Sequence, residues 1–333
     1  MSFDFDPKSP DSDSSYKARY VEIERANDRS WYVQNQHRPF DAVLSVHSAG
    51  EARNPLQTLT YEAMADIRSN VGRRILGGNM SFSQNLGPKE LPVDVRLANA
   101  KENVARVCSD AGIEPRQLRI LGARMSEHSS HPLTPLNVDV FNIDPQSNDP
   151  FFIPETSDFI YSYDPSVVLA ATPADCPIML ASAETPQGTV SMLVHYSWRA
   201  AANGYIEQTD RCFDMLGVDR ETLHIYLSPG AHAENFAYKR AADPRIEFPD
   251  TEGLFRDVHF KNDVWEFGID TPRFAYDRVL QLPGIKPDMV YADTTDTGSY
   301  RSGHSSHNRD FNIDPNHNTR DLLFMVPRSN ALQ

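Results

Sequence analysis

Residues 174–200 read ADCPIMLASAETPQGTVSMLVHYSWRA, and this stretch decides how the rest of the chain is interpreted. An apolar run follows Pro177, and a second one ends at His195 after a Gly-containing turn, so we expect an antiparallel hairpin. Cys176 lies at the start of the first strand and His195 at the end of the second. Hairpin pairing would therefore bring a thiol and an imidazole to the same point, despite the residues between them.

Strands and helices alternate on both sides of this hairpin. The segment 94–113 places Leu97, Val104 and Val107 on one helical face and has Gly112 where a C-cap belongs. Other helices are expected over 61–76, 200–218 and 272–284. Strands are expected over 42–46, 118–125, 188–197, 222–230, 289–293 and 321–327, with two or three short strands within 158–181. This pattern predicts an α+β (mixed α/β) fold with a mostly β core flanked by helices. We expect one domain over residues 16–333 after a disordered acidic tail, residues 1–15.

Composition excludes several classes of partner. The net charge of -14 argues against nucleic acid, whose binding depends on Lys and Arg neutralising phosphates. The polar, acidic N-terminus is unlike a signal peptide, and no apolar run is long enough to span a bilayer. Three cysteines do not suggest a disulfide framework. We therefore expect a reduced, cytoplasmic protein with no membrane partner.

The cysteines and histidines carry the chemistry. Cys108 and Cys212 fall in expected helices, where a buried thiol is the ordinary outcome. Cys176 with His195 suits either a Cys-His nucleophile pair or a transition-metal site. A third donor from RMSEHSSH, residues 124–131, would complete a Cys-His₂ set with an open fourth position, which is typical of catalytic zinc. Zinc is the expected metal, although copper accepts the same ligands.

Several motifs together resemble a known family. TPADCPIML resembles its Thr-Ala-Asp-Cys-x-Pro motif, VHYSWRA its His-Ala-Gly-Trp-Arg-Gly motif, and SFSQNLG its Ser-Leu-Asn-Leu-Gly segment. LSPGAHAENF is similar to its Gly-Pro-x-Ile-Gly loop, and HNTRDLLFMV to its closing strand. The family is that of multicopper polyphenol oxidoreductases, also called laccase-domain proteins or peptidoglycan editing factors, and the resemblance covers residues 70 to 328.

The resemblance implies a laccase-domain fold and a set of site residues. Cys176, His195 and His128 would be the zinc ligands, with His131 as the alternative to His128. Zinc-dependent phosphorolysis of purine nucleosides, adenosine deamination, or both would follow, with phosphate as a co-substrate. The catalytic residues would be Cys176, His195 and Asp175, the last as a proton carrier or water orienter, and the substrate-binding residues Ser83, Asn85 and Arg199.

Other functions stay open at this stage. They are hydrolytic editing of peptidoglycan stem peptides, copper-dependent oxidation of phenols, and binding by a metal-stabilised protein without turnover. Ser197 and Ala200 replace both glycines of the His-Trp-Arg motif, and the family's Gln before the ligand histidine is missing. We expect a small-molecule substrate and a monomer or small homo-oligomer.

Overall fold

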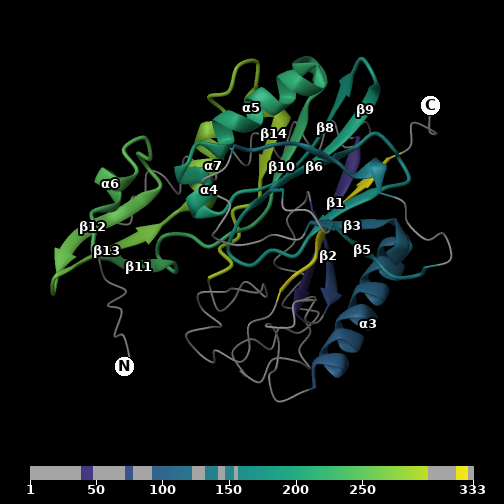
Figure 1. Ribbon diagram of the computed structural model, residues 1–333, viewed down its shortest axis with the longest axis horizontal. Coiled ribbons are helices and arrows are strands. Elements are labelled where there is room, and N and C mark those ends of the chain that lie inside the picture. Colours follow the sequence, from purple (N-terminus) through teal and green to yellow (C-terminus); the bar gives the residue numbers. More distant parts are fainter. Residues whose placement is uncertain are drawn as a thin grey trace.

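The computed structural model describes residues 39–47, 72–77, 92–121, 132–141, 147–153, 157–298 and 320–328. Its strands form two six-stranded sheets and one three-stranded sheet, connected and covered by short helices and one long one (Figure 1). This arrangement confirms the expected mixed α/β class. The expected disordered tail, residues 1–15, lies outside the described residues.

The first sheet packs against the one long helix and includes the first and the last described strands of the chain. Its strands, in spatial order, are β2 (Gly72–Gly77), β1 (Phe40–His47), β15 (Leu323–Pro327), β7 (Val168–Ala171), β3 (Leu118–Leu121) and β5 (Phe151–Phe152). Helix α3 (Val93–Ala111) packs on one face, and Gly112 ends it at a φ of 78°. A left-handed glycine satisfies the last carbonyls of a helix, as the sequence predicted.

The second sheet contains the expected hairpin. Its strands, in spatial order, are β14 (Val290–Ala292), β10 (His224–Leu227), β8 (Ile178–Thr185), β9 (Gly188–His195), β6 (Phe159–Ser162) and β4 (Leu136–Asn137). Strands β8 and β9 pair antiparallel with Ile178 opposite His195, so the expected hairpin is confirmed. The helices that follow are α4 (Trp198–Ala202), α5 (Tyr205–Leu216) and α7 (Thr271–Val279).

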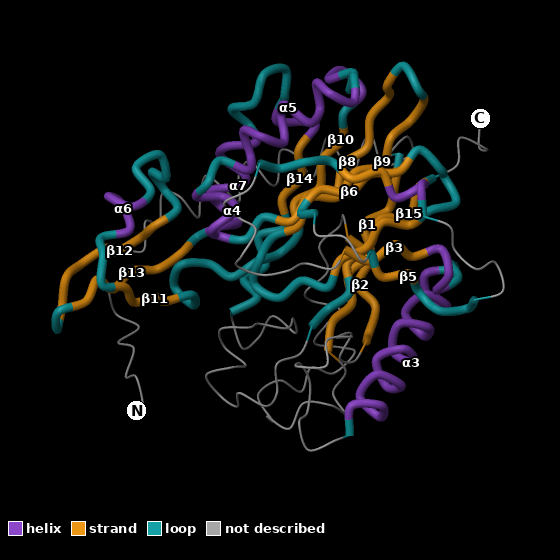
Figure 2. The backbone as a smooth tube through the Cα atoms, viewed as in Figure 1, coloured by secondary structure: helices purple, strands orange, loops and turns teal. Residues whose placement is uncertain are grey.

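The two large sheets pack face to face between helices. Alternate residues of a strand point to opposite faces, and in β8 Ile178 and Leu180 enter the core that the two sheets share. Met179 and Ala181 point the other way, into a core closed by α4, α5 and α7. Figures 1 and 2 show α3 on one side of the molecule and these three helices on the other. The layers are therefore helix, sheet, sheet, helix.

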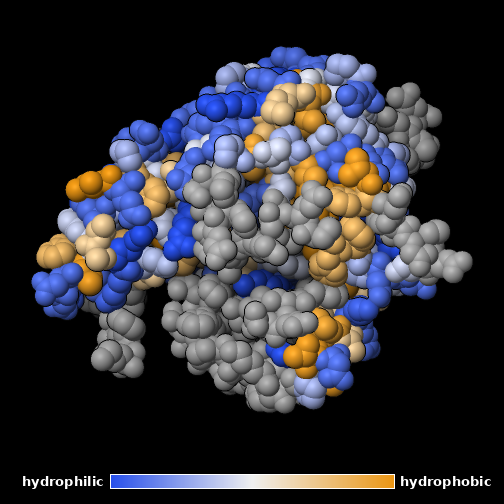
Figure 3. Space-filling view, in the orientation of Figure 1, coloured by the Kyte–Doolittle hydropathy of each residue, from blue (hydrophilic) through white to orange (hydrophobic). Residues whose placement is uncertain are grey.

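A small third sheet extends to one side of the molecule (Figure 2). It consists of β11 (Ala237–Arg240), β13 (Val264–Ile269) and β12 (Phe255–Lys261), with the short helix α6 (Pro244–Glu247) beside it. The 3₁₀ turns elsewhere are η2 (Pro115–Gln117), η3 (Val138–Val140), η4 (Arg220–Thr222) and η5 (Pro287–Met289). Ile246 and Phe260 are exposed here, and hydrophobic and hydrophilic atoms alternate over this end in Figure 3.

One expected helix is wrong in its last part. The helix predicted over 61–76 ends in residues that form β2, which pairs in parallel with β1. Pairing along a sheet edge supplies backbone hydrogen bonds that local helical spacing cannot anticipate, so tertiary context overrides the periodicity. Residues 61–71 lie outside the described residues. Within the described ranges, no helix is both long enough and apolar enough to cross a membrane.

Candidate active site at one edge of the second sheet

Polar side chains gather where the strands of the second sheet begin or end. Cys176 lies two residues before β8 and His195 ends β9, while Asp158 directly precedes β6, which pairs with β9. Ser228 follows β10, and Asp293 follows β14. Strands β10, β8, β9 and β6 each run antiparallel to the next, and β14 runs parallel to β10, so all five residues lie at the same edge of the sheet.

Asp158 holds the catalytic candidate His195 in place. The Asp158 carboxylate oxygen Oδ1 lies 2.9 Å from His195 Nδ1, and the Asp158 carbonyl accepts the His195 backbone N–H at 2.8 Å. Both side chains are largely buried, with exposed fractions of 14% and 7%. A carboxylate on Nδ1 fixes the ring and directs Nε2 away from it. Sequence reasoning missed Asp158, although an acid immediately before a strand that pairs with the His195 strand was an available signal.

The Cys176 thiol forms a hydrogen bond with the same imidazole. Burial by itself lowers the pKa of His195, but hydrogen bonds with Asp158 and with Cys176 outweigh burial and raise this pKa to about 10. With Nδ1 engaged by Asp158, Nε2 is the nitrogen left for the thiol. Both contacts therefore favour the protonated form of the His195 ring. The predicted proximity of this thiol and this imidazole is confirmed.

The other two cysteines have a different environment. Cys108 and Cys212 are buried, with exposed fractions of 0% and 1%, whereas Cys176 is partly exposed. Burial raises the pKa of Cys108 to about 12 and that of Cys212 to about 11. Both are structural thiols, as their helical positions predicted. Cys176 alone combines access to solvent with a neighbouring base.

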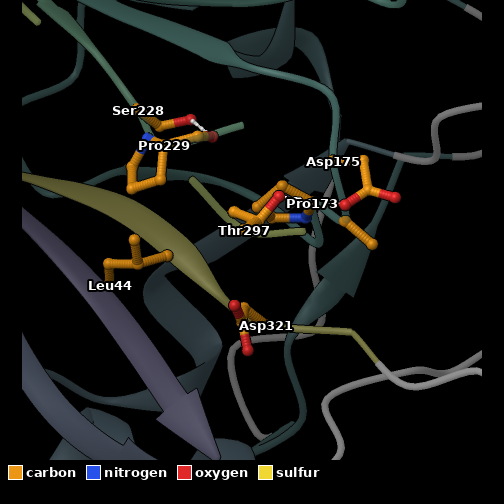
Figure 4. A pocket seen from close by; sticks show the side chains of 8 residues that line it. Leu44, Pro173, Asp175, Ser228, Pro229, Thr297 and Asp321 are labelled. Atoms are coloured by element: carbon orange, nitrogen blue, oxygen red, sulfur yellow. Dashed lines mark hydrogen bonds between the residues drawn. The ribbon is translucent and has the colours of Figure 1, made fainter. Parts of the chain in front are cut away.

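Asp175 faces a small pocket next to this pair. The pocket lies between the two large sheets and is lined by Leu44, Pro173, Ala174, Asp175, Ser228, Pro229, Thr297 and Asp321 (Figure 4). Asp175 is 3% exposed, and its Oδ1 accepts a hydrogen bond from the Thr297 hydroxyl at 2.9 Å. Cys176 and His195 are not among the lining residues. The Asp175 carboxylate therefore faces this pocket, whereas the thiol of the next residue, Cys176, contacts His195.

Arg199 lies on an aromatic platform. Its guanidinium carbon is 5.0 Å from the centroid of the Trp198 ring, and that of Arg240 is 5.9 Å from the same ring. Trp198 in turn packs edge-on against Tyr238 and Phe248, from the segment that forms the third sheet and α6. Across the described parts of the chain, no carboxylate forms an ion pair with Arg199. Its positive charge is thus available to an anionic ligand.

The changed glycines of the His-Trp-Arg motif have structural roles here. Ser197 is the N-cap of α4, and its hydroxyl accepts the backbone N–H of Ala200 at 3.1 Å. A serine cap satisfies a free N–H of the first turn. Ala200 is completely buried against the core of the second sheet.

A second titratable cluster lies on neighbouring loops. Burial raises the pKa of Asp270 to about 6, although His232 and Arg256 lower it and Glu234 and Asp296 raise it. Asp270 also caps α7, because its side chain accepts the Arg273 N–H. His232 is 9% exposed, and its Nε2 has no hydrogen-bond partner among the described residues.

The remaining predicted site residues, Ser83, Asn85, His128 and His131, lie outside the described residues. Among the residues that the structure describes, no group of three His, Cys, Asp or Glu side chains is arranged to hold a metal ion. Of the three expected zinc donors, only Cys176 and His195 lie within the described residues.

The fold and this edge define an α/β protein with a thiol, an imidazole and a carboxylate in one chain of contacts. Over residues 83–313 the sequence matches the family described as multi-copper polyphenol oxidoreductase laccase, and the chain belongs to this family. No curated protein matches the sequence significantly. The family resemblance inferred from the motifs is confirmed.

Solved structures share the fold. The Bacillus licheniformis hypothetical protein YfiH has a TM-score of 0.53 and 14% identity, with 69% of this chain and 82% of that chain covered. YlmD from Geobacillus stearothermophilus has a TM-score of 0.51 and 14% identity, with 70% of this chain and 81% of that chain covered. At such identity the similarity shows the fold alone.

Proposed function

We propose that this protein is a zinc-dependent enzyme that acts on purine nucleosides, by phosphorolysis, by deamination of adenosine, or by both. The observation that carries the proposal is the contact of His195 with both Asp158 and Cys176. A thiol and an imidazole, which are both side chains that can bind a metal ion, meet in this contact at a partly exposed edge of the second sheet. Family membership supports the same site, because the motifs that carry Cys176 and His195 lie within the matched residues.

The donor set suits zinc. Metal-binding histidines usually donate their second ring N–H to a carboxylate, and Asp158 occupies that position on His195. Zinc held by Cys176, His195 and His128 would act as a Lewis acid and lower the pKa of a coordinated water. Binding would require His195 to lose its proton, so Asp158 would then orient a neutral ring.

The protein's own residues would bind and orient the substrate. Arg199, which has no carboxylate partner in the described ranges, would bind phosphate for phosphorolysis. In that reaction a phosphate oxygen attacks C1′, the C1′–N9 bond breaks, and the purine leaves with the bonding electrons and takes up a proton. Asp175, next to the thiol, would carry a proton or orient water, and Ser83 and Asn85 would bind ribose or phosphate oxygens.

The test is a direct assay of purified, zinc-loaded protein. We expect hypoxanthine from inosine plus phosphate, or inosine or adenine from adenosine, and at least a hundredfold loss in Cys176→Ala and His195→Ala. Cys212→Ala is the matched control, because it removes a buried thiol away from the site and should retain the activity. Zinc-loaded protein that produces no purine base and no inosine would refute the proposal.

A second candidate is a thiol hydrolase that edits peptidoglycan stem peptides. The contact chain from Asp158 through His195 to Cys176 has the acid, base and nucleophile order of thiol hydrolases. Such an enzyme would release an amino acid from a stem peptide after removal of all metal, and Cys176→Ala would abolish the release. Chelator-sensitive nucleoside turnover favours the first candidate instead.

Two further readings have their own tests. The family description names copper, and a Cys-His site also accepts copper, so elemental analysis that finds several copper ions per chain would favour phenol oxidation. A binding protein without turnover would lose zinc and thermal stability in Cys176→Ala but show no activity before or after the change.

A further inference from the structure

The peptide that carries Cys176 is held at both of its ends by one loop. The Asp175 carbonyl accepts the Ala231 N–H at 2.9 Å, before the cysteine. After it, the Ile178 N–H donates to the Ser228 hydroxyl oxygen at 2.9 Å, and the Ser228 N–H donates to the Ile178 carbonyl at 2.9 Å. Residues 175–178 are thus fastened to residues 228–231 on either side of the thiol.

A second loop holds the same peptide in an unusual conformation. Asp175 has a φ of 69°, in the left-handed region that costs a non-glycine residue about 1 kcal/mol. The Thr297 hydroxyl donates to Asp175 Oδ1 at 2.9 Å, and the Thr297 N–H donates to the Gly230 carbonyl at 3.1 Å. Both hydroxyl-bearing residues are buried, with exposed fractions of 2% for Ser228 and 5% for Thr297.

The contact between the loops leaves no spare room. A Cβ on Gly230 would lie 2.7 Å from the Asp175 carbonyl oxygen and 2.7 Å from Pro272 Cγ. The loop can approach the Cys176 peptide this closely only because residue 230 has no side chain. On the far side, the Tyr196 N–H donates to the Pro177 carbonyl at 3.0 Å, which links the peptide to the residue after His195.

We propose that Ser228 and Thr297 are positioning residues that clamp residues 175–178 and so hold the Cys176 thiol against His195. Neither side chain needs to touch a substrate for this role. The role of the clamp in catalysis rests on the proposed function. The clamp itself concerns only the position of the Cys176 thiol relative to the His195 ring, so it can be tested in the protein without metal or substrate.

The test measures how fast iodoacetamide alkylates Cys176 in metal-free protein at pH 7, with the modified peptide identified by mass spectrometry. A thiol held in contact with a histidine ring reacts faster than an isolated one. We expect Ser228→Ala and Thr297→Val each to slow the reaction at least fivefold, and Thr297→Ser, which keeps the hydroxyl, to react within twofold of the unaltered protein. The two loops supply independent variants, so a folding failure in one leaves the other informative.

Matched controls separate positioning from general destabilisation. Thr251→Val removes a hydroxyl of equal burial that donates to the Phe248 carbonyl, and Ser182→Ala removes a serine of equal burial within β8. Both controls should lower the melting temperature as much as the clamp variants yet leave the alkylation rate unchanged. Unchanged or faster alkylation in folded Ser228→Ala and Thr297→Val would overturn the clamp. Absence of nucleoside turnover would refute the proposed function without touching this result.

Discussion

At the scale of single residues, the site depends on what surrounds two ordinary side chains. The contacts of His195 with Asp158 and Cys176 outweigh its burial and raise its pKa. Asp158 matters most here, since it contacts His195 through both its carbonyl and its carboxylate. The environment, more than the residue types, makes this Cys-His pair a candidate for chemistry.

Replacing Asp158 with Asn should weaken the site without dismantling it. The amide keeps the size of the side chain but removes the charge that raises the pKa of His195. We expect zinc affinity, measured by competition with a chelator, to fall about tenfold or more. Asp164→Asn, a change at an exposed position beyond β6, serves as control, and equal zinc affinity in the two variants would contradict the role of Asp158.

Asp270 should make stability depend on pH. Its pKa is raised from 3.8 to about 6 by burial, so the folded protein binds this proton more tightly than the unfolded chain. Stability from this group is full below about pH 4 and is lost as pH rises to about 6, by about 3 kcal/mol. Asp270→Asn keeps an acceptor for the α7 cap and should remove this loss. The free energy of urea unfolding from pH 4 to pH 7 checks it, and parallel curves for the two proteins would contradict it.

At the scale of elements, short helices and strand ends present the site. Helix α4 begins at Trp198, directly after its N-cap Ser197, so the start of the helix fixes where Trp198 and Arg199 lie. The third sheet then supports Trp198 from outside through Tyr238 and Phe255. The third sheet, for which no strands were expected from the sequence, therefore supports a residue of the His-Trp-Arg motif.

The cap of α4 offers a graded test. Ser197→Ala removes the acceptor for the Ala200 N–H and should cost about 1 kcal/mol, whereas Ser197→Gly, the family's residue, should cost only a few tenths. Denaturant unfolding measures both. Equal losses in the two variants would show that the hydroxyl does not cap the helix.

At the scale of the whole molecule, the two large sheets share one core. Leu180 and Leu193 from the second sheet pack in the same cluster as Leu44 and Leu323 from the first. The stacked rings of Tyr226 and Tyr291, 5.8 Å apart, lie in that cluster too. Neither sheet can expose its inner face without exposing the other, so we expect the layers to unfold together.

Leu193→Ala should destabilise the whole molecule by about 2–5 kcal/mol, because it opens a cavity in the shared core. Circular dichroism and tryptophan fluorescence should then report the same shifted midpoint. Met215→Ala, at a position that is 71% exposed, is the control and should change stability by less than about 0.5 kcal/mol. Separate midpoints for the two signals would show that the layers unfold independently.

Local patterns alone determined much of this protein. Two apolar runs and the turn between them specified the β8–β9 hairpin, and with it the meeting of Cys176 and His195, because antiparallel pairing fixes which residues face each other. Helix α3 and its glycine end followed from helical spacing and the φ that only glycine adopts freely. The roles of Ser83, Asn85 and His128 stay predictions.

Only the tertiary structure decided which distant segments meet at the site. Asp158, Ser228 and Thr297 reach Cys176 and His195 through sheet order and loop packing, which no local period encodes. The same reason explains β2, whose residues follow a helical spacing yet pair with the edge of β1. Strand neighbours are chosen by long-range burial and hydrogen bonding, so the sequence specified the thiol and the imidazole, and the fold supplied the groups that hold them.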